Sequence, residues 1–504
     1  MPSVSHKLLS GATLRVIGFT IQILIAFFLS PYIIHTLGDR MYGFWVLIGT
    51  FIGYYGLLDF GLSTAVNRHI AGALGAKDDN TIRKVYSTAM PIFFGIGCIA
   101  LLITVIIVIV SPWILTDPEE IPLFRAVILI LGFNMAIDFL ARVYIGTLQA
   151  QMNFHIVSFV QIAASLVRAT LIVMALTAGY KILALAWISF FTTLASNMVY
   201  YYYARKKLPT LIFDIKSFSR STATTLFSYS FFMMISQVAN MLRFQVDVFV
   251  IASFLSLSAV THYSIASTLV NYFNQLLGTI MSVFNPLFSQ QEAAKEHEEI
   301  KETLFFATRI SVAISSFVGF GMVAWGSPFI ERWMGLEYQD AYPCLVVLVL
   351  GVLTFLWQTP AHSYIYATSK HKFLAVLNII EGISNLLLSL VLVRYYGIFG
   401  VALGTFFSLS VSKLIVFPIY FAKVSSFLYA EYMKQLLLYV IKCGVALVVP
   451  FVITSFWIAA DYAHLILVGL LSALFYALFS WVILLSKADR KILISAFLSV
   501  LNKV

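Results

Sequence analysis

Basic side chains occur inside apolar stretches of this sequence, where a charge is costly. Six of them lie in stretches long enough to cross a membrane: Arg15, Arg142, Arg168, Arg243, Lys413 and Lys442. Each would cost about 2.5–3.5 kcal/mol at the centre of a helix that faces lipid. Guanidinium groups offer paired hydrogen bonds that match phosphate oxygens. The sequence therefore predicts an anion site built from Arg15, Arg68, Arg142, Arg168, Arg243 and Lys413, with Lys442 snorkelling to the interface.

Four carboxylates accompany these charges: Asp59, Asp138, Asp247 and Glu381. Asp138 precedes Arg142 by four positions, and Arg243 precedes Asp247 by four, which is a contact spacing on a helix. Two interpretations stay open for these pairs, an internal ion pair that lowers the cost of burial and a site for a coupling ion. Arg15 and Arg168 have no carboxylate at that spacing, so they are the better candidates for substrate contact.

Amide side chains stand among aromatic residues in the second half of the chain, including Tyr263, Tyr272 and Phe273. The amides are Gln237, Asn240, Gln245, Asn271, Asn274, Gln275, Asn378 and Asn385. Hydroxyl edges and apolar ring faces of a sugar suit such a mixture, so we predict glycan contacts at Asn240, Asn271 and Gln275. The alternative is that the amides bridge helices, at about 0.6 kcal/mol each.

The composition places these residues in a polytopic membrane protein. Apolar residues make up 61% of the 504, charged residues only 11%, and the mean hydropathy is +0.94. The net charge of +10 is scattered through short loops, which favours positive-inside topology over a nucleic-acid partner. The sequence has no phosphate-binding Gly-x-x-x-x-Gly-Lys-Ser/Thr loop, and its three cysteines have no disulfide or metal spacing. We expect no cofactor, and energy from a gradient such as that of protons or sodium ions.

Apolar runs predict an all-α fold of about fourteen transmembrane helices. They fall near residues 8–34, 41–66, 85–112, 121–149, 153–177, 180–203, 225–254, 258–285, 304–328, 341–367, 372–394, 398–421, 435–459 and 462–486. Lys and Arg concentrate in alternate loops, which places both termini in the cytoplasm. The expected parts are an N lobe over 1–204, a basic cytoplasmic linker over 205–222, a C lobe over 223–422, and two further helices with a tail over 423–504.

An internal repeat supports the two lobes. Ala76-Lys77-Asp78 with Ile82-Arg83 returns as Ala294-Lys295-Glu296 with Ile300-Lys301, at a constant offset of 218. An offset that spans six helices keeps the orientation, so we expect parallel repeats around a central cavity.

One stretch carries a family resemblance. Residues 56–68, Gly-Leu-Leu-Asp-Phe-Gly-Leu-Ser-Thr-Ala-Val-Asn-Arg, and the tract from Ile70 to Lys84 resemble the bacterial Wzx-type polysaccharide flippases, which are related to the lipid II flippase and the MATE exporters. The hydrophobic layout is similar over the whole chain, but the motif-level resemblance covers only residues 37–90. It implies a bacterial inner-membrane protein and an undecaprenyl-pyrophosphate-linked glycan as substrate. It also implies membrane lipid, a polysaccharide polymerase and a chain-length regulator as candidate partners.

The leading hypothesis is therefore a flippase that carries lipid-linked oligosaccharide, such as an O-antigen or capsule repeat unit, from the cytoplasmic to the periplasmic leaflet by alternating access. No covalent step is required, so we do not expect an enzyme. The main alternative is a MATE-like exporter of small cations driven by sodium or protons, although a cation pump favours a net acidic interior. A membrane glycosyltransferase or polysaccharide ligase is a third hypothesis, but the longest predicted outer loop, about residues 326–342, is short for catalysis.

Overall fold

The computed structural model confirms a helical membrane protein. It describes residues 4–115, 117–227, 238, 241, 245–294, 297–368, 370, 372–425, 427–455, 462–487 and 489–490, with the side chains of residues 4–16, 297 and 453–455 left aside. The described residues contain helices and no strand. By contacts between Cα atoms the chain divides into two compact units, residues 1–241 with 255–261, and residues 242–254 with 262–504.

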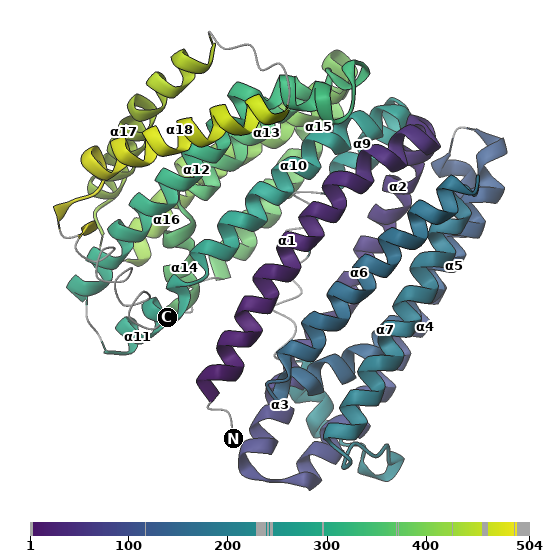
Figure 1. The fold of residues 1–504 in the computed structure, drawn as a ribbon. Coiled ribbons are helices and arrows are strands. Elements are labelled where there is room, and N and C mark those ends of the chain that lie inside the picture. The colour runs from purple at the N-terminus through teal and green to yellow at the C-terminus, as the bar shows by residue number, and fades with distance from the viewer. Residues whose placement is uncertain are drawn as a thin grey trace. The chain divides into compact units, whose positions relative to one another are not determined.

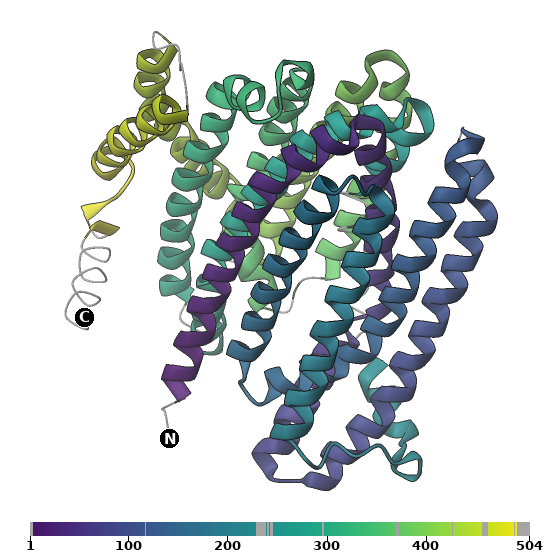
Figure 2. The same ribbon diagram turned by 45° about the vertical axis from the view of Figure 1, so that its right-hand side comes forward.

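The first unit is a bundle of long helices, drawn from purple to teal in Figures 1 and 2. Its α-helices are α1 (Val4–Leu37), α2 (Asp39–Tyr55), α3 (Leu62–Ala76), α4 (Asp79–Ile114), α5 (Ile121–Ala150), α6 (Phe154–Thr177) and α7 (Ile182–Lys207). Short 3₁₀ turns lie at Gly56–Asp59, Pro118–Glu120 and Ile215–Ser217. Helix α5 packs along both α4 and α7, and α6 packs along α1 and α7.

The stretch with the family resemblance is a break between two helices. The expected apolar helix over 41–66 ends at Tyr55, and after the 3₁₀ turn the left-handed backbone of Phe60 (φ 50°) and Gly61 (φ 77°) starts a new helix, α3. Arg68, two residues beyond the predicted span, therefore lies within α3. That helix ends at Ala76, and the Asp78 carboxylate caps α4 by accepting from the Thr81 hydroxyl and amide, which lowers the pKa of Asp78.

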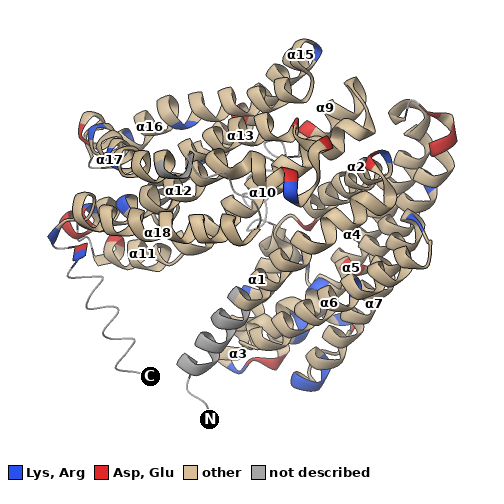
Figure 3. Ribbon diagram, turned by 45° about the horizontal axis from the view of Figure 1, so that its top comes forward, with Lys and Arg blue, Asp and Glu red and all other residues tan. Residues whose placement is uncertain are grey.

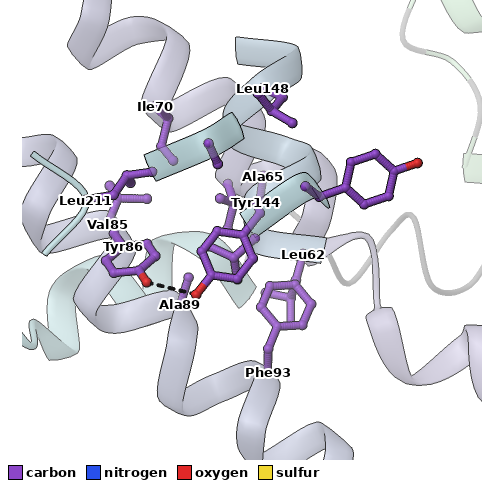
Figure 4. Packing of buried hydrophobic residues seen from close by; sticks show 14 of the residues in the cluster. Leu62, Ala65, Ile70, Val85, Tyr86, Ala89, Phe93, Tyr144, Leu148 and Leu211 are labelled. Atoms are coloured by element: carbon purple, nitrogen blue, oxygen red, sulfur yellow. Dashed lines mark hydrogen bonds between the residues drawn. The ribbon is translucent and has the colours of Figure 1, made fainter. Parts of the chain in front are cut away.

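Aromatic and small side chains fill the core of the first unit. Leu62, Ala65, Tyr86, Phe93 and Tyr144 are all buried, and the Tyr86 and Tyr144 hydroxyls lie 3.1 Å apart (Figure 4). In a bilayer the hydrophobic effect does not distinguish lipid from protein, so van der Waals packing and such interhelical hydrogen bonds hold the helices together. This packing fixes α3, α4 and α5 relative to one another, and these helices carry several of the predicted site residues.

The second unit contains the helices drawn from green to yellow in Figure 1. They are α9 (Val246–Phe254), α10 (Leu257–Met281), whose first residues belong to the first unit, α11 (Phe284–Ala294), α12 (His297–Trp333), α13 (Ala341–Leu356), α14 (Thr359–Ala367), α15 (Lys372–Val411), α16 (Phe417–Val424), α17 (Tyr429–Ser455) and α18 (Tyr462–Ile483). A 3₁₀ turn lies at Leu336–Tyr338, and a π-helical turn at Ser412–Val416 joins α15 to α16.

Helix α15 is a hairpin of two helices that meet at Gly397, whose φ of 57° and ψ of −137° are not helical. The two arms touch along their length, because Ser389 lies against Val401 and Thr405 lies against Asn385. The arms approach closely at Gly400: a Cβ atom there would lie 2.2 Å from the carbonyl oxygen of Leu392. This close approach brings the polar side chains of both arms together.

Gly400→Ala should therefore destabilise the protein. The Leu392 oxygen belongs to backbone, which cannot rotate away, so the arms must separate, and overpacking of this kind typically costs about 1–3 kcal/mol. Gly469→Ala in α18 is the control, since among the described residues nothing beyond its own stretch of helix lies within 4 Å of the new Cβ, and alanine favours a helix. Thermal unfolding of the detergent-solubilised protein, followed by helical circular dichroism, should show a lower midpoint for the first variant only. Equal midpoints would contradict the hairpin packing.

Among the described residues, ten helical segments are long and apolar enough to cross a membrane, or eleven when the bent pair α13 and α14 counts as one span. The predicted spans 372–394 and 398–421 fall in one continuous segment, and span 225–254 lies largely outside the described residues. The count of fourteen stays a prediction. Helix boundaries recur at the offset of the sequence repeat: α3 and α11 end 218 positions apart, at Ala76 and Ala294, and α6 and α15 begin 218 positions apart.

Candidate functional site

A cluster of charges lies in the first unit where α5 meets the end of α2. Arg142 Nη1 is 3.4 Å from Asp59 Oδ1, and its Nε is 3.6 Å from Asp138 Oδ2. Asn197 of α7 donates to Asp138 across 3.3 Å, and the guanidinium lies 4.6 Å from the centre of the Phe139 ring. Of the two interpretations left open for Asp138 and Arg142, the structure shows the internal ion pair. Asp59 joins it from another helix, so Arg142 has two carboxylate partners.

Arg168 has a different environment. It projects from α6, is partly buried, and donates from Nε to the Thr192 hydroxyl at 3.1 Å and from Nη2 to the Thr193 hydroxyl at 3.3 Å. In the part of the chain that the structure describes, no carboxylate oxygen lies within 4 Å of its guanidinium. Neutral hydroxyls hold the group in place without cancelling its charge, so Arg168 can still attract an anion. The charge of Arg142, in contrast, is already balanced by Asp59 and Asp138.

In the described part of the chain, the remaining predicted arginines do not lie together at one place. Arg68 is exposed on α3, next to Asn67, whose amide donates to Gln149 at 3.4 Å. Arg15 lies in α1, but its side chain is outside the described part, as are Arg243 and Asn240. Figure 3 shows that much of the described charge lies near helix ends. The full predicted anion site therefore stays a prediction.

A buried ion pair forms in the second unit. Lys413 Nζ lies 3.0 Å from Glu381 Oε2 and 3.1 Å from Asn378 Oδ1, and both charged side chains are 0% exposed. Lys413 stands in the π-helical turn after α15, and its backbone carbonyl accepts a hydrogen bond of 2.6 Å from the Gln358 side chain. Sequence reasoning assigned Lys413 to the substrate and Glu381 to a coupling ion. The structure joins them, and neither side chain has exposed surface to offer a ligand.

Asp247 is the centre of a second buried group in this unit. Its Oδ2 accepts from the Tyr263 hydroxyl and lies 3.0 Å from Thr405 Oγ1, and its Oδ1 accepts from Asn385 Nδ2 at 3.1 Å. Asn385 Oδ1 and the Val401 carbonyl lie 3.1 and 3.4 Å from Thr405 Oγ1. One carboxylate, a hydroxyl and carbonyl oxygens thus converge where the α15 hairpin meets α9. Arg243, the predicted partner of Asp247, lies outside the described residues, so their pairing stays a prediction.

The predicted amides divide between buried and accessible positions. Asn378 and Asn385 are buried and take part in the two groups just described, whereas Asn271 is partly buried and Gln275 is exposed on α10. Sequence reasoning missed the hydroxyl partners Thr192, Thr193 and Thr405. Hydroxyls in apolar helices are common, and only their contact with a charged side chain on another helix marks these three. No three His, Cys, Asp or Glu side chains gather as metal ligands among the described residues.

The chain is similar in sequence to known membrane proteins. The chain is 22% identical over 495 residues to EpsK, a membrane protein of Bacillus subtilis, covering 95% of this chain and 96% of the relative. It is also 22% identical over 410 residues to a Shigella flexneri protein named as an O-antigen transporter, covering 79% of this chain and 94% of the relative.

Two solved structures share the fold. The lipid II flippase MurJ in an inward closed conformation superposes with a TM-score of 0.67 at 16% identity, over 92% of this chain and 97% of MurJ. An inward-facing multidrug resistance transporter of the MATE family, in the MOP superfamily, superposes with a TM-score of 0.70 at 14% identity, over 82% of this chain and 97% of the transporter. The profile of the family described as polysaccharide biosynthesis protein matches residues 8–292, more than half of the sequence. The chain belongs to this family.

Proposed function

We propose that the protein is a flippase, not an enzyme, and moves an oligosaccharide linked to undecaprenyl pyrophosphate from the cytoplasmic to the periplasmic leaflet of the bacterial inner membrane. The family, the relative named as an O-antigen transporter and the fold shared with the lipid II flippase support this proposal. Membrane lipid surrounds the protein, both termini lie in the cytoplasm, and a polysaccharide polymerase and chain-length regulator act on the product.

Arg168 is the observation that carries the substrate assignment. Burying the charge of a guanidinium in a membrane-spanning helix costs free energy, and the two threonine hydroxyls that Arg168 contacts are neutral. A bound anion would offset this cost. The pyrophosphate of a lipid carrier supplies such an anion at membrane depth, while its polyprenyl chain stays in lipid. Arg142 is the weaker candidate because it has Asp59 and Asp138 as partners.

A direct assay tests the flippase itself. The purified protein is reconstituted in vesicles that contain a fluorescent polyprenyl-pyrophosphate oligosaccharide, and a membrane-impermeant reagent measures how much label reaches the opposite leaflet. Faster exchange than in protein-free vesicles supports the proposal, and no acceleration contradicts it. Export of cationic dyes from cells that overproduce the protein, without lipid exchange, would instead favour a MATE-like exporter.

Coupling to an ion gradient is the second part of the proposal, and Asp247 is its candidate. Oxygen ligands, including backbone carbonyls, suit a hard cation such as sodium, and a carboxylate can alternatively carry a proton. Asp247, Thr405, Asn385 and Val401 present this set of oxygens inside the second unit. Burial of the group means that an ion entering it must shed water, so occupancy can be linked to a conformational change.

Asp247→Asn should remove the dependence of transport on the gradient. The amide keeps the size of the side chain but loses the charge that attracts a cation and the group that takes up a proton. Exchange rates are measured in proteoliposomes with an imposed sodium or pH gradient, with Asp79→Asn at the exposed start of α4 as the control. We expect at least a tenfold smaller response to one gradient in the Asp247 variant alone. A variant that responds like the control would exclude Asp247 as the coupling site.

A further inference from the structure

Helices α6 and α7 border a groove on the first unit that has a polar end and an apolar length. The two helices lie side by side in Figures 1 and 2. The groove has a volume of 740 Å³, and its polar end is formed by His155 at the start of α6 with Tyr203 and Lys207 at the end of α7. Away from this end its walls are mainly apolar, including Phe159 and Phe191. One polar end and one apolar body match a molecule with a headgroup and a hydrocarbon chain.

The walls are accessible from outside the unit. Phe159 is 68% exposed and Phe191 is 58% exposed, so the groove presents accessible apolar surface on two helices long and apolar enough to span a membrane. Alanines 163, 164 and 195 also line it, and their short side chains leave room for a guest between the larger ones. Along α6 the lining runs from His155 to Leu171, roughly 24 Å at the rise of an α-helix. Half of the hydrocarbon core is about 15 Å, so one acyl chain of a leaflet fits along it.

The polar end lies in the most basic segment of the first unit. Arg205, Lys206 and Lys207 are consecutive at the end of α7. Arg205 turns to the Leu211 carbonyl, and the Lys206 ammonium lies 5.6 Å from the centre of the Tyr202 ring, whereas Lys207 lines the groove. Such clusters mark the cytoplasmic surface and attract anionic headgroups by about 1 kcal/mol per basic residue.

We propose that this groove binds an anionic glycerophospholipid of the cytoplasmic leaflet, with the phosphate at Lys207 and His155 and one acyl chain between α6 and α7. A polyprenyl carrier is the poorer occupant, because its single chain is much longer than the groove. The phosphate contact uses neither Arg168 nor the Asp247 group, although Thr192, which accepts a hydrogen bond from Arg168, also lines the groove. It gives the face of the first unit between α6 and α7 a specific lipid partner.

Native mass spectrometry of the full-length protein, titrated with phosphatidylglycerol or phosphatidylcholine, tests the headgroup contact. Lys207→Gln should weaken phosphatidylglycerol binding about fivefold and leave phosphatidylcholine binding unchanged. Lys181→Gln is the matched control, because Lys181 is an exposed lysine at the opposite end of α7. An equal loss in both variants, or none in the Lys207 variant, would overturn the proposal.

Ala164→Phe tests the chain contact by filling the groove. It should reduce binding of both lipids, whereas Val105→Phe, at a 47% exposed position on α4, should not. Lipid bound as well by the Ala164 variant as by the Val105 variant would contradict a chain in the groove. Displacement of phosphatidylglycerol by equimolar undecaprenyl phosphate would assign the groove to the carrier and overturn the choice of phospholipid. Leaflet exchange by the Lys207 variant, which leaves Arg168 and Thr192 unchanged, reports on the flippase separately.

Discussion

Replacement of Arg168 by alanine should abolish delivery of surface polysaccharide while the protein remains in the membrane. The substitution removes the guanidinium that the Thr192 and Thr193 hydroxyls hold without neutralising it. A charge-assisted hydrogen bond is worth about 1.5–3 kcal/mol, or roughly ten- to a hundredfold in rate when it acts in the rate-limiting state. Polysaccharide is measured by immunoblot in a strain lacking its own flippase, and membrane protein by detection of a tag.

Two further variants separate the charge from its surroundings. Arg168→Lys keeps the charge but loses the paired geometry, so it should rescue transport in part. Arg220→Ala removes an exposed arginine beyond α7 and should leave transport unchanged. Full polysaccharide with Arg168→Ala would exclude this residue as the anion ligand. If Arg168→Lys were as inactive as alanine and Thr192→Val also lost activity, the fixed guanidinium geometry, and not the charge alone, would be the requirement.

The order and approximate length of the membrane-spanning helices could be predicted from the sequence, because each helix is a long, continuous apolar run. The predicted end of span 372–394 and start of span 398–421 flank Gly397, where the structure has the hairpin turn of α15. The break at Phe60 and Gly61 was missed, because an apolar run does not show where a left-handed residue divides it. Helix propensity and hydropathy indicate how long an apolar segment is, whereas a break in the helix depends on the backbone conformation of one or two residues.

Only part of the candidate site could be predicted from the sequence, for a related reason. Asp138 and Arg142 are four residues apart on one helix, so their ion pair could be predicted from spacing. Asp59 contacts the same arginine from another part of the chain, and Glu381 contacts Lys413 only because α15 folds back and continues into the π-helical turn. Such contacts follow from how the helices pack, which residue spacing does not encode. A list of charges within membrane spans therefore overestimates the number available to a ligand.

The buried pair of Lys413 and Glu381 should respond very differently to single and double replacement. Lys413→Met leaves an unpaired carboxylate in a site with 0% exposure, and breaking such a pair typically costs about 3–5 kcal/mol. Glu381→Gln leaves an unpaired ammonium with a similar cost. The double variant removes both charges, so we expect it to be close to the wild-type protein in stability, with a coupling energy of several kcal/mol between the two positions.

The cysteines of the chain supply a specific measurement of this coupling. Cys344 and Cys443 are buried in the second unit, whereas Cys98 is exposed on α4 in the first. In a Cys98→Ser background, a thiol-reactive fluorogenic dye reports unfolding of the unit that contains the ion pair. Both single variants should label at lower temperature than the parent, and the double variant should label near it. If the double variant were as labile as the sum of the singles, the two charges would act independently, and the attraction across 3.0 Å would not stabilise the fold.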